Sequence, residues 1–405
     1  MTPGTILRAG GVLCASLTLS ATLSATPATT ALAATRPGGL PGPAGDCPGS
    51  RGVAVPAATP WAQQALSFAS VWPLTRGAGV TVAVVDSGVD ANPQFGNRII
   101  EGPDLASGLA ATPADADCVG HGTSVASIIA AAPVAGVSFA GVAPAADVLS
   151  VKITNSDTFA SSVAAQAVRA AVTAGAQVIN LSLATVSSPA LASAVQFAQA
   201  SNVVVVAAAG NDNPDGAVGP FYPAAYPGVL SVGAVGPDGS LASFSDTRTP
   251  VSVTAPGADV TAAYPGVFPK AYNPGSNGTS FATAFVSGAA ALVRAAHPDL
   301  DQAEVVARIT ATANGAAGPG TGHGLVNPVQ AVTAVLPATG AGSGVSSPGR
   351  VQIDRAPRPD RAAASIALPL VAVAGGLAAL VVAAAVIVPA GRRRHWSPGP
   401  PSSQP

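Results

Sequence analysis

The chain has 405 residues, of which 48% are hydrophobic and 9% charged, and its formal net charge is -1. This balance excludes a charge-rich disordered protein and a nucleic-acid binder that depends on bulk basicity, so no nucleic-acid partner is expected. The length allows one large domain or about two to three small ones. The high alanine, glycine and valine content is typical of a close-packed α/β fold.

Residues 1–33 are predicted to be a secretory signal peptide. Arg8 precedes an apolar run, and a small-residue cleavage site follows at residues 31–33. The basic region is thin, so a retained N-terminal anchor is the alternative. Removal of the peptide takes Cys14 with it and leaves Cys47 and Cys118. An even pair of cysteines in an exported protein indicates a disulfide, with two free buried thiols as the alternative.

The C-terminal region predicts a single membrane anchor. Residues 366–390 are apolar and long enough to cross a bilayer as a helix. Three arginines follow at once, so the positive-inside rule places residues 391–405 in the cytoplasm and the main domain outside the cell membrane.

A Pro/Gly-rich linker is expected at residues 336–365, between the main domain and the anchor. Its opening letters, LPATG at 336–340, match a sortase sorting pattern. A long spacer separates them from the apolar span, which favours a coincidental match.

Residues 61–335 are expected to form an α/β domain in which strands and helices alternate. Strand-like runs occur at 80–86, 146–154, 177–183, 203–210, 228–235 and 251–257; helix-like runs occur at 123–132, 161–175, 189–202, from 279 onward and at 301–313. Near-continuous Val/Ile runs indicate strands covered on both faces. The sequence therefore predicts three layers, with a mostly parallel sheet between helices.

In open α/β sheets, functional residues gather at the carboxyl ends of the strands. This rule directs attention to Asp86, Ser182 and Asn211, each at or just beyond the end of a predicted strand.

Three Gly-rich turns carry the residues of a nucleophilic site. Asp86 ends a buried strand in VVDSGVD, His121 lies between glycines in CVGHGTSVAS, and Ser280 enters a helix in GTSFATAFVSG. Considered singly, each has an ordinary structural alternative: an aspartate that caps a turn, a loop histidine, and a serine that, like Thr279, serves as a helix N-cap.

Considered together, the three residues predict a catalytic triad. A serine hydroxyl needs a base to become a nucleophile at neutral pH, and the base needs a buried carboxylate that fixes its tautomer. Asn211, in VVVVAAAGNDN, can donate its side-chain amide to a developing oxyanion, with the backbone N–H of Ser280 as the second donor. A turn asparagine is the alternative for Asn211.

These motifs, with VINLSL and GVAPAADVLSVKI, resemble the subtilisin-type serine proteases over roughly residues 79–315, in the chain order Asp, His, Ser of that family. The resemblance implies a subtilisin-like fold, a triad of Asp86, His121 and Ser280, and Asn211 as the oxyanion asparagine. It also implies two sets of substrate-binding residues: the strand residues Ser182, Leu183 and Ala184, and the P1-pocket residues Ala208, Ala209 and Gly210.

A narrower resemblance connects the chain with the mycosins, membrane-anchored subtilases of type VII (ESX) secretion systems. It rests on PWAQQALSFASVWPLTRGAGVTVAVVDSGVD, DCVGHGT and GHGLVNPVQAV, together with the signal, the cysteine pair and the single anchor. The resemblance implies that residues 34–60 wrap the catalytic domain as an extension tied by Cys47–Cys118. It also implies partnership with the secretion membrane complex.

Two positions depart from the subtilase pattern. Ala284 stands where the family usually has proline, and alanine suits a helix at least as well, so the helix is expected to persist. Ala184 stands where the substrate strand usually ends in glycine, and its methyl group is expected to narrow the cleft.

The remaining histidines are assigned minor roles: His297 as a C-terminal helix cap, His323 in a turn and His395 in the cytoplasmic tail. Asp90 matches one ligand position of a subtilisin calcium site, but no ligand loop accompanies it. Neither a metal site nor a cofactor is expected.

The leading hypothesis is thus an exported, membrane-anchored serine endopeptidase that acts on a protein or peptide substrate, processing proteins of a type VII secretion system. The alternative is a structural component of the secretion complex whose proteolytic activity is dispensable.

Overall fold

The computed structural model describes residues 53–54, 57–106, 117–156, 159–211, 219–266, 272–315, 318–336 and 361–393. The predicted signal peptide, most of the linker and the tail beyond residue 393 lie outside these ranges, as do Cys14, Cys47 and His395. The chain divides into two compact units, Met1–Thr339 and Gly340–Pro405, which are described separately.

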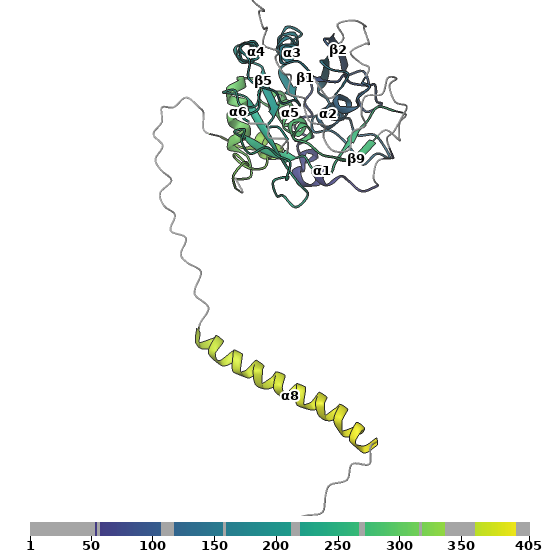
Figure 1. Cartoon of the computed structure of the whole chain (residues 1–405), viewed down its shortest axis with the longest axis vertical. Coiled ribbons are helices and arrows are strands. Elements are labelled where there is room, and N and C mark those ends of the chain that lie inside the picture. The colour runs from purple at the N-terminus through teal and green to yellow at the C-terminus, as the bar shows by residue number, and fades with distance from the viewer. Residues whose placement is uncertain are drawn as a thin grey trace, which may run out of the picture. The chain divides into compact units, whose positions relative to one another are not determined.

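A parallel sheet forms the centre of the first unit, as predicted (Figure 1). Within the described residues it has seven strands in the order β2-β3-β1-β4-β5-β6-β7, and every neighbouring pair is parallel. The strands are β1 Thr81–Asp86, β2 Ile99–Asp104, β3 Asp147–Lys152, β4 Val178–Leu181, β5 Val204–Ala208, β6 Leu230–Val235 and β7 Val253–Pro256. A separate antiparallel pair joins β8 (Val260–Ala263) to β9 (Tyr272–Ser276).

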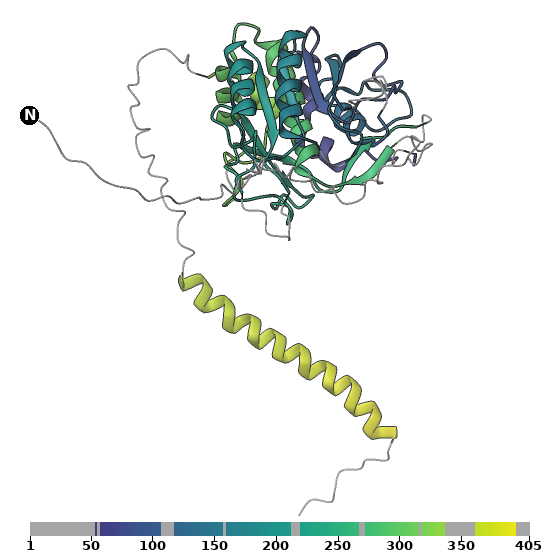
Figure 2. The same cartoon turned by 45° about the horizontal axis from the view of Figure 1, so that its top comes forward.

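Helices cover both faces of the sheet and complete the three predicted layers (Figure 2). They are α1 Trp61–Leu66, the 3-10 helix η1 Phe68–Val71, α2 His121–Ala130, α3 Ser161–Thr173, α4 Pro189–Ala200, α5 Thr279–Ala296, α6 Gln302–Ala311 and α7 Pro328–Thr333. Successive side chains of a strand point to opposite faces. Val82 and Val84 of β1 accordingly belong to the apolar cluster that contains α2 and α5, whereas Ala83 and Val85 join the cluster of α3 and α4.

Local sequence explains where several helices start and stop. Gly175 follows α3 with a φ of 84°, a left-handed conformation that favours glycine. Ser188 caps α4, whose first residue is Pro189, by accepting a hydrogen bond from Leu191 N. Helix α2 starts at His121, two residues before the expected start at residue 123.

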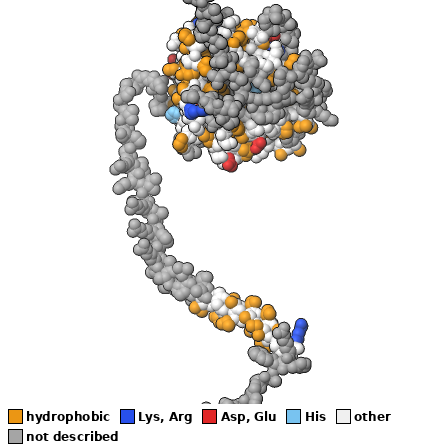
Figure 3. Space-filling model, in the orientation of Figure 1, with side chains coloured by type: hydrophobic (Ala, Val, Ile, Leu, Met, Phe, Trp, Pro, Cys, Tyr) orange, Lys and Arg blue, Asp and Glu red, His pale blue; other side chains and the backbone are white. Residues whose placement is uncertain are grey.

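Helix α5 and the C-terminal helix α8 (Arg361–Arg393) are both apolar enough to cross a membrane, but they differ in burial. In α5, 89% of the apolar window is buried, so α5 is the core helix of the protease unit. The window of α8, Val373–Arg393, has a mean hydropathy of 2.4 and no buried share. Apolar side chains cover its described part, and basic residues stand at its end (Figure 3). The predicted anchor at 366–390 lies within α8, which is a candidate membrane span.

Only a few residues of the predicted N-terminal extension, 34–60, are described. Val53 forms an isolated antiparallel bridge with Tyr272 of β9, through Val53 N to Tyr272 O at 2.9 Å and Tyr272 N to Val53 O at 3.2 Å. This part of the extension therefore lies against the catalytic unit. Cys118 is disulfide-bonded; the predicted pairing with Cys47 stays a prediction because Cys47 is outside the described residues.

Candidate active site

Three adjacent strands deliver the predicted site residues to one edge of the sheet. Strands β1, β4 and β5 are neighbours and run parallel, so their carboxyl ends lie side by side. Asp86 is the last residue of β1, Ser182 follows β4, and Asn211 lies three residues beyond β5. Helix α5 packs on these strands and begins at the same edge, which brings Ser280 to the site.

Asp86 and His121 form a hydrogen-bonded pair. His121 Nδ1 lies 2.7 Å from Asp86 Oδ1, and the same oxygen accepts from Ser87 N at 2.8 Å. The Asp86 side chain is buried and the His121 side chain is 12% exposed. Since the carboxylate accepts, Nδ1 carries a hydrogen in the neutral imidazole and Nε2 has the lone pair that can take a proton. The ring packs against Phe281, with centroids 5.5 Å apart.

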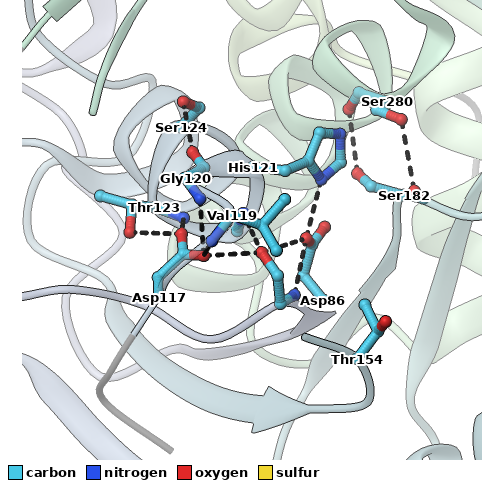
Figure 4. A network of polar contacts seen from close by, with 12 residues as sticks. Asp86, Asp117, Val119, Gly120, His121, Thr123, Ser124, Thr154, Ser182 and Ser280 are labelled. Carbon is cyan, nitrogen blue, oxygen red and sulfur yellow. Dashed lines mark hydrogen bonds and ion pairs between the residues drawn. The ribbon is translucent and has the colours of Figure 1, made fainter. Parts of the chain in front are cut away.

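Ser280 does not cap its own helix. The N-cap of α5 is Gly278, whose φ of 154° is one that residues with a Cβ rarely adopt. The Ser280 hydroxyl instead donates to Ser182 O at 3.2 Å, and Ser182 Oγ donates to Ser280 O at 3.0 Å. Figure 4 shows this double contact and places His121 between Asp86 and Ser280. Both simple capping alternatives, Thr279 and Ser280, are therefore wrong.

The side chain of Asn211 supplies the cap that α5 lacks. Asn211 Oδ1 accepts from Thr279 N and from Thr279 Oγ1, both at 3.0 Å. The oxygen is thereby committed to the helix N-terminus, and the Nδ2 end of the amide is the one available to donate toward a substrate. The Asn211 backbone is held as well, through a bridge to Ser245.

The other predicted substrate residues lie along the same edge. Strand β4 ends at Leu181, so the segment Ser182–Ala184 continues beyond it; Leu183 is buried and Ala184 is half-buried. Ala208 and Ala209 are buried near the end of β5, and Gly210 has a φ of 106°. A Cβ on Gly210 would lie 2.5 Å from the Phe221 ring, so the ring packs directly on this backbone.

A buried polar chain that the sequence analysis did not single out connects β4 to α5. Asn180 Nδ2 donates to Ser182 Oγ at 2.9 Å, and Ser287 Oγ donates to Asn180 Oδ1 at 2.9 Å. Asn180 and Ser287 are fully buried. Buried polar groups that are satisfied in this way fix a single packing arrangement, so they hold the middle of α5 in register with Ser182.

A second buried group escaped the sequence analysis, although DCVGHGT contains it. Asp117 stands four residues before His121, is 3% exposed, and accepts hydrogen bonds from Ser87, Val119, Gly120 and Thr123. Burial raises its pKa, and the hydrogen bonds from Thr123, Gly120 and Ser87 act against that rise. Its sequence position could have revealed it, because it is the one charged residue in the turn that leads to His121.

Ala284, His297 and His323 lie where the sequence predicts them. Helix α5 continues through the buried Ala284 without interruption, as predicted. His297 is the C-cap of α5, and its Nε2 lies 2.8 Å from Val332 O of α7. His323 lies in a turn and its backbone N donates to Ser252 O. Within the described ranges, no group of three or more His, Cys, Asp or Glu side chains is placed to hold a metal ion.

The chain is similar to several known proteins. The profile of the subtilase family, Peptidase_S8, matches residues 77–342. Mycosin-1 of Mycolicibacterium smegmatis is 34% identical over 334 residues, which cover 69% of this chain and 73% of that protein.

Two solved structures are similar as well. One is the serine protease MycP1, described as an essential component of the type VII (ESX-1) secretion system, with a TM-score of 0.62 and 32% identity over 71% of this chain and 94% of that one. The other belongs to an intact ESX-5 inner membrane complex, with a TM-score of 0.60 and 30% identity over 84% of this chain and 93% of that one. The chain therefore belongs to the subtilase family, with the mycosins among its relatives, and is a serine endopeptidase.

Proposed function

We propose that Asp86, His121 and Ser280 are the catalytic triad of this endopeptidase. The observation that carries the proposal is the 2.7 Å contact between His121 Nδ1 and Asp86 Oδ1, on an imidazole whose ring lies beside Ser280. The Asp86 carboxylate fixes the tautomer that leaves Nε2 ready to accept a proton and stabilises the imidazolium that forms.

In the first step Ser280 Oγ attacks the carbonyl carbon of the scissile peptide bond, and its hydrogen moves to His121 Nε2. The hydroxyl first leaves Ser182 O, to which it donates in the resting enzyme. The tetrahedral intermediate carries its negative charge on the former carbonyl oxygen, where Asn211 Nδ2 and the backbone N–H of Ser280 donate.

The intermediate collapses when the C–N bond breaks and His121 returns the proton to the leaving amine. The acyl group remains on Ser280 as an ester. A water molecule then gives a proton to His121 and attacks the ester carbonyl, and the second collapse releases the carboxylic acid and restores the serine.

The substrate is proposed to lie along the segment Ser182–Ala184 in an extended conformation. The segment continues the line of β4 past the strand end, which leaves backbone groups beside Ser280 for pairing with a peptide. Ala184 is half-buried at this edge, and we propose that its methyl group narrows the cleft. Ala208, Ala209 and Gly210 are proposed to form part of the P1-pocket wall.

The physiological role is proposed to be processing of proteins of a type VII secretion system by an enzyme anchored in the cell membrane. The similarity to a chain of an ESX-5 inner membrane complex, which covers 84% of this chain and 93% of that one, supports this role. Helix α8 supplies the membrane span, and Arg392 and Arg393 at its end favour a cytoplasmic C-terminus with the protease unit on the other side.

The alternative, a structural component with dispensable proteolysis, is favoured by one observation: the similar chain was solved within an assembled membrane complex. Replacing Ser280 by alanine in the encoding organism separates the two roles. Loss of substrate processing with continued secretion indicates a scaffold that does not depend on catalysis, whereas loss of both ties secretion to proteolysis. Peptide hydrolysis by the full-length protein in detergent, undiminished in the Ser280→Ala variant, would refute the triad itself.

A further inference from the structure

Asp117 is a buried carboxylate that lies outside the proposed triad (Figure 4). Its Oδ1 accepts from Ser87 Oγ at 2.8 Å, Gly120 N at 2.8 Å and Val119 N at 3.2 Å. Its Oδ2 accepts from Thr123 N at 2.8 Å and Thr123 Oγ1 at 2.7 Å. A carboxylate removed from water is costly unless donors surround it in this way, and none of these contacts involves the reacting atoms.

The donors to Asp117 come from both sides of the Asp86–His121 pair. Ser87 directly follows Asp86, whereas Gly120 directly precedes His121. The Ser87 hydroxyl also accepts from Gly122 N, the residue after His121, at 3.0 Å. Both chain neighbours of the base are thus hydrogen-bonded to one serine–aspartate pair.

The single hydrogen of the Ser87 hydroxyl has two carboxylates within reach. Asp117 Oδ1 lies at 2.8 Å and Asp86 Oδ1 at 3.3 Å. The shorter contact is the stronger hydrogen bond, so the hydrogen is directed to Asp117. Asp86 Oδ1 then accepts its two close hydrogen bonds, from Ser87 N and from His121 Nδ1, without a third close competitor.

Helix α2 has no cap of its own. Its N-cap residue is Gly120, in a left-handed conformation with a φ of 85°, so it offers no side chain. Asp117 replaces the missing cap from three residues earlier, because it accepts from Thr123 N in the first turn. His121 is the first residue of this helix, and its backbone position therefore depends on Asp117.

We propose that Asp117 and Ser87 are positioning residues that set the geometry between Asp86 and His121, and through it the rate at which His121 takes the proton of Ser280. The proposal rests on the triad assignment above. It assigns to Asp117 no contact with substrate. The expected consequence of disturbing the pair is slower chemistry at unchanged binding, since misplacement of a catalytic group by about 1 Å can cost about 100-fold in rate.

The test uses the full-length protein in detergent and a fluorophosphonate probe that reacts with the nucleophilic serine. Saturation kinetics give the maximal inactivation rate, kinact, and the apparent binding constant of the probe, KI. The variants are Asp117→Asn, Ser87→Ala and the control Ser127→Ala. Ser127 is also a fully buried serine with two hydrogen bonds, to Ser124 O at 2.7 Å and from Ala263 N at 2.9 Å, but it lies further along α2.

We expect kinact to fall about 10- to 100-fold in Asp117→Asn and in Ser87→Ala, with KI within about twofold of wild type. Ser127→Ala should keep kinact within about twofold at a similar loss of thermal stability. Ser87→Ala removes only one oxygen atom and should fold. It therefore tests the positioning role even if Asp117→Asn does not fold.

Wild-type kinact in Ser87→Ala, or an equal fall in Ser127→Ala, overturns the positioning role. If the wild-type protein is not labelled at Ser280, the triad assignment is wrong, and the positioning role that rests on it is wrong as well. Labelling at Ser280 with an unaffected Ser87→Ala variant overturns the inference alone.

Discussion

Asn211 Oδ1 accepts hydrogen bonds from both the backbone N–H and the hydroxyl of Thr279, each at 3.0 Å. One side chain beyond β5 thus caps the helix that carries the adjacent Ser280. These two hydrogen bonds couple the position of the proposed oxyanion donor to that of the proposed nucleophile.

This double role predicts that two substitutions of Asn211 both lose activity but differ in stability. Asn211→Ala removes the helix cap, which should lower the free energy of unfolding by about 1 kcal/mol. It also removes the oxyanion donor, which should lower kcat by about 10²–10³-fold, a magnitude that was measured for the asparagine of subtilisin. Asn211→Asp keeps an acceptor for Thr279 but removes the donor. Its kcat should fall at least as far, while its thermal midpoint stays above that of Asn211→Ala. Near-wild-type turnover in Asn211→Asp would contradict the oxyanion role.

The turn before His121 predicts that replacing Gly120 by alanine strongly destabilises the protein. Gly120 and Gly175 have nearly the same φ, 85° and 84°, but a Cβ on Gly175 meets nothing within 4 Å, whereas one on Gly120 lies 2.1 Å from Tyr264 Cε2. Gly175→Ala should cost about 1–2 kcal/mol from backbone strain alone. Gly120→Ala should cost about 1–3 kcal/mol more, since Tyr264 must move.

Chemical denaturation of the two glycine variants measures the free energies, and peptide hydrolysis by the folded protein measures the effect on catalysis. Gly120→Ala should also lose activity because the residue lies next to the base, while Gly175→Ala should remain fully active. Equal losses of stability in the two variants would show that the Tyr264 contact is unimportant.

Asp246 is expected to contribute stability that is lost at low pH. Burial of this carboxylate acts to raise its pKa, but the hydrogen bonds from Arg248 and Thr249 outweigh it, and the pKa lies below the ordinary value of 3.8. A depressed pKa in the folded state stabilises the protein above pH 3.8, and this contribution is lost as the pH falls through the folded value.

Replacement of Asp246 by asparagine should therefore destabilise the protein most at neutral pH. Urea denaturation as a function of pH should show the gap between wild type and variant closing below about pH 3.8. A gap that widens toward acid would have the wrong sign for this explanation.

Because α8 is the proposed membrane anchor, the protein should be found in the membrane fraction. Deletion of residues 361–405 should release the proteolytic activity from the membrane fraction, because α8 is the proposed membrane span and the other long apolar helix, α5, is buried in the protease unit. Fractionation of cells that express the full-length and truncated chains tests this, with Ser280→Ala as the full-length control. Activity that remains with the membrane after deletion would point to retention through another segment.

The sequence was sufficient to predict the sheet edge and the residues placed there. Apolar runs rich in Val, Ile and Leu identified β1, β4 and β5 as buried parallel strands. Parallel strands bring their carboxyl ends together, so the positions of Asp86, Ser182 and Asn211 followed from pattern alone. The polar edge strand β2 was not predicted, since its sequence, IIEGPD, shows neither alternation nor an unbroken apolar run.

The polar contacts of the site could not be predicted in the same way. The cap that Asn211 provides joins residues 68 positions apart, and the chain from Ser287 through Asn180 joins residues 107 positions apart. Such contacts depend on how α5 lies across the strands. Ser280 considered alone suggested an N-cap because the residue that does cap α5, Asn211, comes from a distant part of the chain.

The central claim, that Ser280 is the nucleophile activated by His121, is tested most directly by locating the adduct of a fluorophosphonate probe. The full-length protein is labelled and digested, and the modified peptide is identified by mass spectrometry. We predict an adduct on Ser280 in the wild type and labelling slowed by about 10³-fold or more in His121→Ala. An adduct on a different serine, or an equal labelling rate in His121→Ala, would contradict the account.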